Sequence, residues 1–331
     1  MSTRVLREGA GLFEMSDRGL VEVSGGDRVR WLNGMVSNDV AVLDEASGQT
    51  GCYAALLTPQ GRIVSDLHIV LRGDRFWLET AVGHVTRVIG RLEKYIFADD
   101  VELRDASADF ARFGVEGACA RANIEAAAGA ALVVKPDGFQ EIEVAGAAVA
   151  VAAFGFSGED AYQLLVAKPD AAAVVAALVD AGCVRAESST LEMMRIEAGE
   201  PALGSELAED TLPDEARIGR AISESKGCYT GQEVIARLRS RGGVKHLLVG
   251  LRSESDEVLA DPGSRIFRPD EKKSGELTSK VTSEAAGGEI ALGFVHRDDA
   301  APGTRLVCGD RGVVVCPLPF VELASPRASK T

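Results

Sequence analysis

The stretch K-G-C-Y-T-G-Q-E, residues 226–233, places a thiol two residues from an ammonium and between two glycines. A nearby cation lowers the pKa of a cysteine, and the thiolate is its reactive form. Val234, Ile235 and Leu238 follow at helical spacing, so we expect a loop that enters a helix. Because helix N-termini favour negative charge, Cys228 is a candidate reactive thiol, with Lys226 as its activating group.

The same stretch has a second interpretation. Free cysteine is among the residue types that are most often buried, so Cys228 could equally be a structural residue enclosed in a tight turn. The six cysteines are scattered and form no C-x-x-C pair. We therefore expect neither a disulfide framework nor a metal or iron–sulfur cage, and no permanently bound metal. Because cysteines without a disulfide framework are typical of proteins in a reducing compartment, we expect this protein in the cytoplasm.

Length and charge bound the class of protein. A chain of 331 residues is long enough for two or three domains. It contains no apolar run of about 18 residues, so no membrane span is expected. The net charge of −14 argues against direct binding to nucleic acid. Residues 226–246 are locally basic, which indicates either a local anion site or a solvated helix face.

Local patterns predict several elements. Residues 19–24, 52–57 and 63–71 read as strands, and T-P-Q-G-R at 58–62 has the chemistry of a hairpin turn. Residues 188–198 read as a helix with Ser188 or Ser189 as its N-cap and Gly199 after its end. After residue 243, short β-like runs alternate with Gly, Pro and Asp, which predicts a small β-barrel or sandwich.

Several of these stretches resemble one family. K-G-C-Y-T-G-Q-E is similar to the signature of the folate-binding YgfZ-type proteins, which are relatives of the aminomethyltransferase (T-protein) of the glycine cleavage system. Further similarity lies at residues 34–40, 58–67, 155–163 and 194–207. The C-terminal stretches G-E-L-T-S-K-V-T-S and P-G-T-R-L-V match as well, so the resemblance covers nearly the whole chain.

The resemblance implies an α+β fold shaped as a three-lobed ring. Its first lobe, the folate-binding domain, is discontinuous, and we place it at residues 1–50 and 145–243. The second α+β lobe is placed at 51–144, and the C-terminal β-barrel with its tail at 244–331. Folate is expected in the hole between the lobes, where the packing of domains creates a concave site.

The resemblance also implies tetrahydrofolate as the cofactor. The aspartate that lies near the reacting nitrogens of folate in aminomethyltransferases falls on Asp66, which would be catalytic together with Cys228 and Lys226. On the residues alone, Asp66 is as well explained as an exposed strand carboxylate. Residue matches complete the expected folate-binding set with Gln163, Arg195, Glu197 and Tyr229, the last for stacking on the pterin.

Two positions depart from the aminomethyltransferase pattern. Gln163 stands where those enzymes carry glutamate, and Leu191 stands where they carry arginine. The glutamine still forms hydrogen bonds but carries no charge, and the leucine binds no anion. Both departures speak against glycine-cleavage activity.

The resulting hypothesis is a YgfZ-type accessory protein. It would support iron–sulfur cluster assembly or repair in client enzymes, including tRNA-modifying ones, with tetrahydrofolate and the Cys228 loop. Its expected partners are folate and iron–sulfur enzymes or assembly proteins, and no association with a membrane is expected. The alternative is a folate-dependent aminomethyltransferase or demethylase, and a third interpretation is a non-catalytic scaffold.

Overall fold

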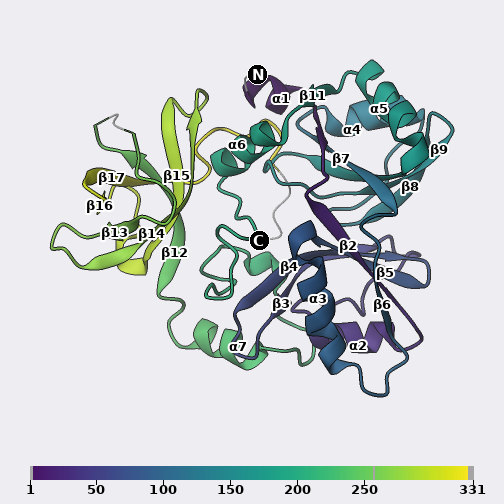
Figure 1. Cartoon of the computed structure of the whole chain (residues 1–331), viewed down its shortest axis with the longest axis horizontal. Coiled ribbons are helices and arrows are strands. Elements are labelled where there is room, and N and C mark those ends of the chain that lie inside the picture. Colours follow the sequence, from purple (N-terminus) through teal and green to yellow (C-terminus); the bar gives the residue numbers. More distant parts are fainter. Residues whose placement is uncertain (1–2, 256–257, 327–331) are drawn as a thin grey trace.

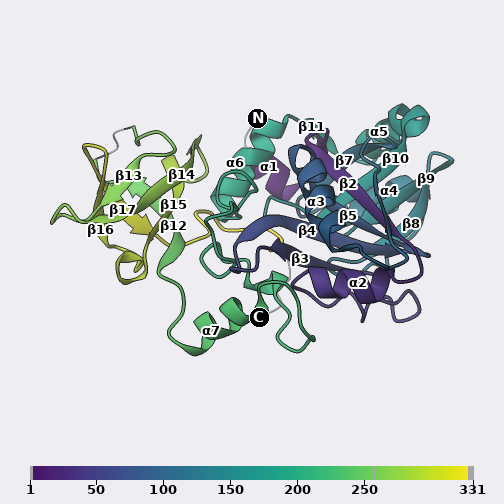
Figure 2. The same cartoon turned by 60° about the horizontal axis from the view of Figure 1, so that its bottom comes forward.

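Two stacked sheets and a closed barrel form the frame of the molecule (Figure 1). The structure is a computed structural model that describes residues 3–255 and 258–326. The two sheets lie together on one side, and the barrel stands apart from them (Figure 2). The α+β class and the C-terminal β-barrel predicted from the sequence are confirmed.

The first sheet has five strands in the order β3-β4-β5-β2-β6. Helices α2 (Arg28–Met35) and α3 (Val85–Leu92) cover its apolar face, where Trp31 and Val88 pack against strand residues such as Leu67 and Leu78. The hairpin predicted around residues 58–62 joins β3 to β4. The strands are β2 (Arg18–Ser24), β3 (Gly51–Leu57), β4 (Ile63–Arg72), β5 (Arg75–Ala81) and β6 (Glu102–Asp105).

The second sheet has six strands in the order β11-β1-β7-β10-β9-β8. Helices α4 (Ala120–Ala128) and α5 (Ala171–Asp180) cover one face through Ile124 and Leu178. The opposite face packs against the first sheet, where Leu20 and Trp77 share a core with Ala152. The strands are β1 (Gly11–Glu14), β7 (Phe110–Glu116), β8 (Phe139–Val144), β9 (Ala147–Ala152), β10 (Ala161–Ala167) and β11 (Val184–Ala186).

The barrel closes in the order β12-β15-β14-β13-β16-β17. Helix α7 (Gln232–Ser240) precedes it, as the spacing after the K-G-C-Y-T-G-Q-E stretch predicted. The barrel strands are β12 (His246–Ser253), β13 (Arg265–Phe267), β14 (Lys273–Ser283), β15 (Gly288–His296), β16 (Arg305–Cys308) and β17 (Arg311–Cys316). Short 3-10 helices are η1 (Val82–His84), η2 (Glu93–Tyr95), η3 (Lys168–Asp170), η4 (Gly219–Ala221) and η5 (Arg297–Asp299).

The strands are grouped differently from the expected lobes. β2 precedes residue 50 but pairs with β5 and β6, whereas β7 and β8 lie within 51–144 but belong to the sheet of β10. The five-stranded sheet therefore combines strands from both sides of the domain boundary expected near residue 50. The six-stranded sheet combines strands from both sides of the boundaries expected near residues 50 and 145. The cause is non-local pairing, since β1 and β2 follow each other in the chain and enter different sheets. The division into lobes stays a prediction.

Helix α6 (Ser188–Ala198) joins the sheets to the barrel. Its N-cap is Glu187 rather than Ser188 or Ser189, and it ends at Gly199, whose φ of 76° is the left-handed conformation that glycine adopts at helix ends. Ile196 on α6 packs among barrel residues that include Ile290. Helix α6 therefore fixes the barrel relative to the stacked sheets.

A buried ionic network holds this junction together. Arg7 of α1 (Thr3–Glu8) donates to Glu197 at 2.9 Å and to Glu159 at 2.8 Å, and both glutamates are fully buried. Thr3 and Ser283 also donate to Glu197, at 3.0 and 2.5 Å. One cation thus connects the N-terminal helix, the turn before β10, helix α6 and the barrel.

Replacing Arg7 with methionine is expected to lower the free energy of unfolding by about 3–5 kcal/mol, because it leaves two buried carboxylates without their cation. The measurement is urea unfolding at neutral pH. Arg4→Met is the matched control on the same helix, since in the described residues Arg4 forms an exposed pair with Glu8 and its loss should change stability far less. Equal losses in the two variants would contradict the role given to Arg7.

Candidate functional site

Asp66 lies between the two sheets and is incompletely hydrogen-bonded. It stands on β4 opposite Ala55 of β3 and is 7% exposed. The Tyr53 hydroxyl donates to its Oδ2 at 3.0 Å, whereas its buried Oδ1 has no hydrogen-bond partner. A buried carboxylate oxygen without a partner is costly, so Oδ1 is an acceptor available to a ligand or a water. Asp66 is therefore buried, and the alternative interpretation of it as an exposed strand carboxylate is wrong.

The surroundings keep Tyr53 protonated. Burial and the adjacent carboxylate of Asp66 raise the pKa of Tyr53 well above its ordinary value. Tyr53 therefore stays a hydrogen-bond donor at neutral pH and holds one oxygen of Asp66 in place. Sequence reasoning missed Tyr53, although its position in the strand paired with β4 was the signal that could have found it.

Several aromatic rings cluster near Asp66. The rings of His68 and Phe154 stack with centroids 3.7 Å apart, and the His68 and Tyr53 centroids are 4.6 Å apart. The guanidinium of Arg18 lies 4.6 Å from the centroid of Phe156. Of these rings, Phe156 lines the pocket described below, and an aromatic surface of this kind suits a planar ligand.

Arg18 is matched by a carboxylate of the same sheet. It forms a two-pronged ion pair with Glu79, with Nη2 2.9 Å from Oε2. Burial opposes the charge of Arg18, but the attraction of Glu79 outweighs it and raises the arginine's pKa. Asp66 and Asp17 contribute smaller attractions of the same sign. Asp66 thus lies within electrostatic reach of an arginine that is already paired.

A pocket of about 340 Å³ opens beside this pair. Arg18 and Phe156 line it on the side of the sheets, and the first turns of α6 line it on the other side. Leu191 contributes an apolar surface, packed with Leu6 and Met194 in the core below. The full lining is Met15, Asp17, Arg18, Phe156, Ser188, Ser189, Leu191, Glu192, Arg195 and Ala202.

Gln163 lies on β10 and contacts a second buried acid. Its Nε2 is 3.4 Å from Oε1 of Glu116, which also accepts hydrogen bonds from the backbone N–H groups of Phe156 and Ser157. Glu116 therefore fixes the turn that carries Phe156. Sequence reasoning did not single out Glu116, and a glutamate at the end of an apolar strand was the available signal.

Arg195 and Glu197 are engaged within the protein. All five N–H donors of Arg195 are used. Nε and one N–H of Nη2 donate to Glu192, and the other N–H of Nη2 donates to Ser279. Nη1 donates to Glu206 and to the backbone oxygen of Glu200. Glu197 belongs to the network around Arg7 described above. The two side chains lie on different sides of α6, as their spacing predicted. Their expected roles in folate binding stay predictions, but neither side chain offers a free group to the pocket.

The K-G-C-Y-T-G-Q-E loop exposes its thiol. Cys228 is exposed, so the interpretation as a buried structural cysteine is wrong. Tyr229 is 8% exposed and packs in a core with Tyr53 and Ile235. Gly231 has a φ of 86° and approaches the Thr58 carbonyl so closely that a Cβ would lie 2.6 Å from it. The loop is therefore seated on the turn between β3 and β4.

Lys226 anchors this loop to the segment after α2. Its Nζ donates to the carbonyls of Asn33, Val36 and Asn38 at 2.6, 2.7 and 2.8 Å. Burial lowers the pKa of Lys226 to about 8, so the amine is still protonated at pH 7 and its three N–H groups match three acceptors. The contacts of Lys226 are those of a structural clamp, and its expected role in activating Cys228 stays a prediction.

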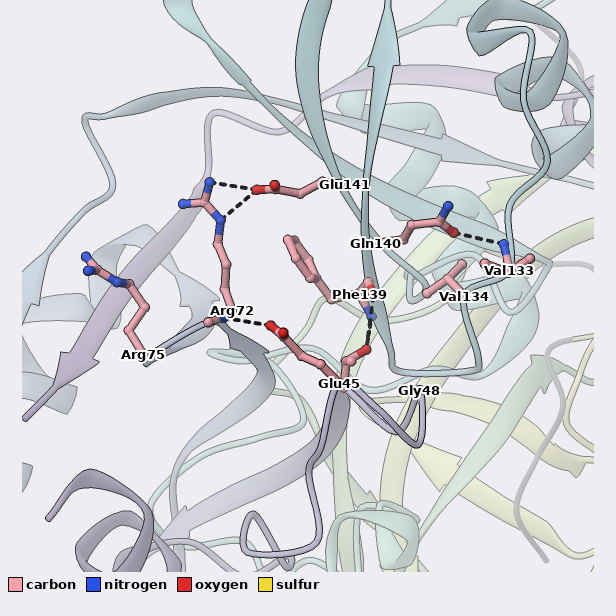
Figure 3. A pocket seen from close by; sticks show the side chains of 11 residues that line it. Glu45, Gly48, Arg72, Arg75, Val133, Val134, Phe139, Gln140 and Glu141 are labelled. Carbon is pink, nitrogen blue, oxygen red and sulfur yellow. Dashed lines mark hydrogen bonds and ion pairs between the residues drawn. The ribbon is translucent and has the colours of Figure 1, made fainter. Parts of the chain in front are cut away.

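A second, larger concavity contains none of the predicted site residues. It has a volume of about 790 Å³ and lies between the β4–β5 turn and β8 (Figure 3). Its charged groups have partners: Arg72 pairs with Glu141 at 2.6 Å, Arg75 pairs with Glu22 and Asp74 outside the lining, and Glu45 accepts from the backbone of Gly73. The polar groups that lack partners lie elsewhere, so this concavity does not mark the candidate site.

Residues 3–255 and 258–326 show neither a metal-binding cluster nor a helix able to span a membrane. Within these ranges, no group of three or more His, Cys, Asp or Glu side chains is arranged to hold a metal ion. None of the helices described there has the length and hydropathy of a segment that crosses a bilayer.

Comparison with known proteins identifies relatives along almost the entire chain. The GCVT N-terminal domain matches residues 2–226, and the glycine cleavage T-protein C-terminal barrel domain matches residues 247–322. An aminomethyltransferase of Saccharopolyspora erythraea is 30% identical over 96% of this chain and 87% of its own length. One of Bacillus subtilis is 29% identical over 90% of this chain and 83% of its own length.

The fold also matches a solved structure. The crystal structure of glycine cleavage system aminomethyltransferase T from Bartonella henselae superposes with a TM-score of 0.84 at 24% identity. The match covers 97% of this chain and 89% of that chain. It shows that the stacked sheets and the barrel have the arrangement of that protein.

Lys226→Met is expected to lower the free energy of unfolding by about 3 kcal/mol, because three carbonyls lose a charged donor. Urea unfolding measures this loss. Lys245→Met is the control, since Lys245 is exposed and its loss should change stability by less than about 0.5 kcal/mol. If Lys226→Met is as stable as its control, Lys226 is not the clamp described here.

Proposed function

This chain belongs to the family defined by the GCVT N-terminal domain and the glycine cleavage T-protein C-terminal barrel, and from that premise we propose a folate-binding protein of the YgfZ type. It supports iron–sulfur cluster assembly or repair in client enzymes. The observation that carries the folate part is the buried Oδ1 of Asp66, which has no partner. The observation that favours the accessory role is the exposed thiol of Cys228.

The residues around Asp66 fit a reduced pterin. The ring offers N–H donors, and Asp66 supplies an unpaired acceptor whose second oxygen is held by Tyr53. Phe156 supplies an apolar face at the pocket, and Gln163 supplies an amide that both donates and accepts. Bound tetrahydrofolate supplies a nitrogen that accepts a one-carbon unit. Asp66 would orient that nitrogen and accept its proton in a hydrogen bond.

The Cys228 loop is suited to transient contact with a partner. A single thiol does not hold a cluster by itself, so any cluster contact is shared with the client or assembly protein. Both ends of the loop are anchored, because Lys226 binds the segment at the end of α2 and Gly231 packs on the β3–β4 turn. A fixed, exposed thiol is accessible to a protein partner in a way that a buried thiol is not.

An aminomethyltransferase is the second candidate. The relatives named above that carry this name, and the retention of Asp66, favour it. Gln163 and Leu191 weigh against it, because the first removes a charge and the second is packed with Leu6 and Met194. Turnover of an aminomethyl donor with tetrahydrofolate, abolished in Asp66→Asn, would establish this candidate in place of the accessory role.

Asp66→Asn is expected to weaken tetrahydrofolate binding at least about tenfold, since a hydrogen bond to a charged acceptor is lost. Anaerobic calorimetric titration measures the affinity. Asp180→Asn at the end of α5 makes the same charge change outside the pocket lining and should bind as the unaltered protein does. Unchanged affinity in Asp66→Asn would remove Asp66 from the site, and no binding by the unaltered protein would refute the folate proposal.

Cys228→Ala is expected to abolish support of client iron–sulfur enzymes while the protein stays folded, because the exposed side chain makes no core contact. The activity of a client enzyme, measured in cells that depend on this protein, is the readout. Cys316→Ala, which removes a partly buried thiol from β17, should leave that activity intact. Full client activity with Cys228→Ala would exclude the thiol from the function.

A further inference from the structure

The pocket beside Arg18 and Phe156 carries two acidic side chains among the residues that line it. Asp17 and Glu192 line it, and both residues are exposed. Asp17 forms no ion pair with any of the described residues, although it attracts the neighbouring Arg18. Glu192 faces the same pocket from the second turn of α6. A ligand that extends outward from Asp66 past Arg18 therefore meets these two carboxylates.

The arginines of this pocket offset only part of this negative charge, because Arg195 pairs with Glu192 whereas Asp17 has no ion pair with a described residue. Arg195 uses every N–H donor on acceptors within the protein, and Arg18 is held by both oxygens of Glu79. Arg112 is buried beside Arg18 and Glu79, and its Nε and Nη2 have no hydrogen-bond partner, but it is absent from the pocket lining. These three arginines are outnumbered by the carboxylates around them, which are Asp17, Asp66, Glu79, Glu192 and Glu206.

Folates differ in the number of glutamates on their tail, and each added glutamate adds negative charge. Recognition of such a tail requires free arginine or lysine groups. The pocket offers none that is unpaired, and Leu191 contributes an apolar surface in their place. Like charges in the pocket lining oppose an anionic tail by an amount that depends on ionic strength.

We propose that Asp17 and Glu192 are specificity-determining residues that make this protein select folates with a short glutamyl tail over polyglutamylated ones. This inference rests on the proposed folate binding and adds the class of ligand that the site prefers. The pterin end is recognised at Asp66, and Asp17 and Glu192 set the preference for tail length.

The test compares tetrahydrofolate with one and with five glutamates, by anaerobic calorimetric titration at low ionic strength. The pentaglutamate is expected to bind at least about threefold more weakly, as several unfavourable contacts between exposed charges would produce. Raising the ionic strength to about 0.5 M should bring the two affinities together, because the charges are then screened. A steric cause would leave the ratio unchanged and would overturn the proposal.

Two variants locate the effect. Asp17→Asn should strengthen pentaglutamate binding about threefold and leave monoglutamate binding nearly unchanged, whereas Asp180→Asn should change neither. Glu192→Gln should favour the pentaglutamate further, since it also releases two donors of Arg195. An Asp17→Asn protein with the original preference would overturn the proposal.

The two proposals fail in different ways. If the unaltered protein binds the pentaglutamate more tightly than the monoglutamate, the tail preference is wrong and folate binding stands. If it binds neither form, and also fails to bind a tetrahydropterin without a tail, folate binding itself is wrong and the preference falls with it.

Discussion

The buried contact between Arg7 and its two glutamates is the constraint on which the rest of the structure depends. Glu159 belongs to the turn before β10, and Glu197 belongs to α6. Glu159 also accepts from the backbone of Ser325 at 2.7 Å, so the segment after the barrel is held at the same point. Because buried ions are tolerated only when they are paired, helix α1, the turn before β10, helix α6, the barrel through Ser283 and the segment after it must assemble together. Helix α6 acquires its position from this network, and with it one wall of the pocket.

The same principle explains why Asp66 stands out. Nearby charges are matched within the protein: Arg18 by Glu79, Arg195 by Glu192 and Glu206, and Lys226 by three carbonyls. Asp66 has one oxygen fixed by Tyr53 and the other without a partner. Nε and Nη2 of Arg112 also lack hydrogen-bond partners, but Oδ1 of Asp66 is the one buried carboxylate oxygen of the described residues in this state, and an open acceptor of this kind is suited to bind a donor.

Local sequence patterns predicted the hairpin of β3 and β4, helix α6 with its terminal Gly199, helix α7 and the barrel, because each depends on neighbours in the chain. The grouping of strands could not be predicted, since the pairing of β2 with β5 and of β7 with β10 is non-local. Long-range contacts also account for the missed site residues: Tyr53 gains its role only when β3 pairs with β4. The proximity of Lys226 to Cys228 in sequence suggested activation, but its ammonium is bound by the segment after α2, almost two hundred residues earlier.

A crystal structure of the protein prepared anaerobically with tetrahydrofolate would show most directly whether Asp66 binds the ligand. The account predicts a pterin whose N–H group lies about 3 Å from Oδ1 of Asp66, with Tyr53 still donating to Oδ2. It also predicts that the ligand extends into the pocket beside Arg18 and Phe156. A ligand seated instead in the concavity between the β4–β5 turn and β8, or one that leaves Oδ1 of Asp66 without a partner, would contradict the account.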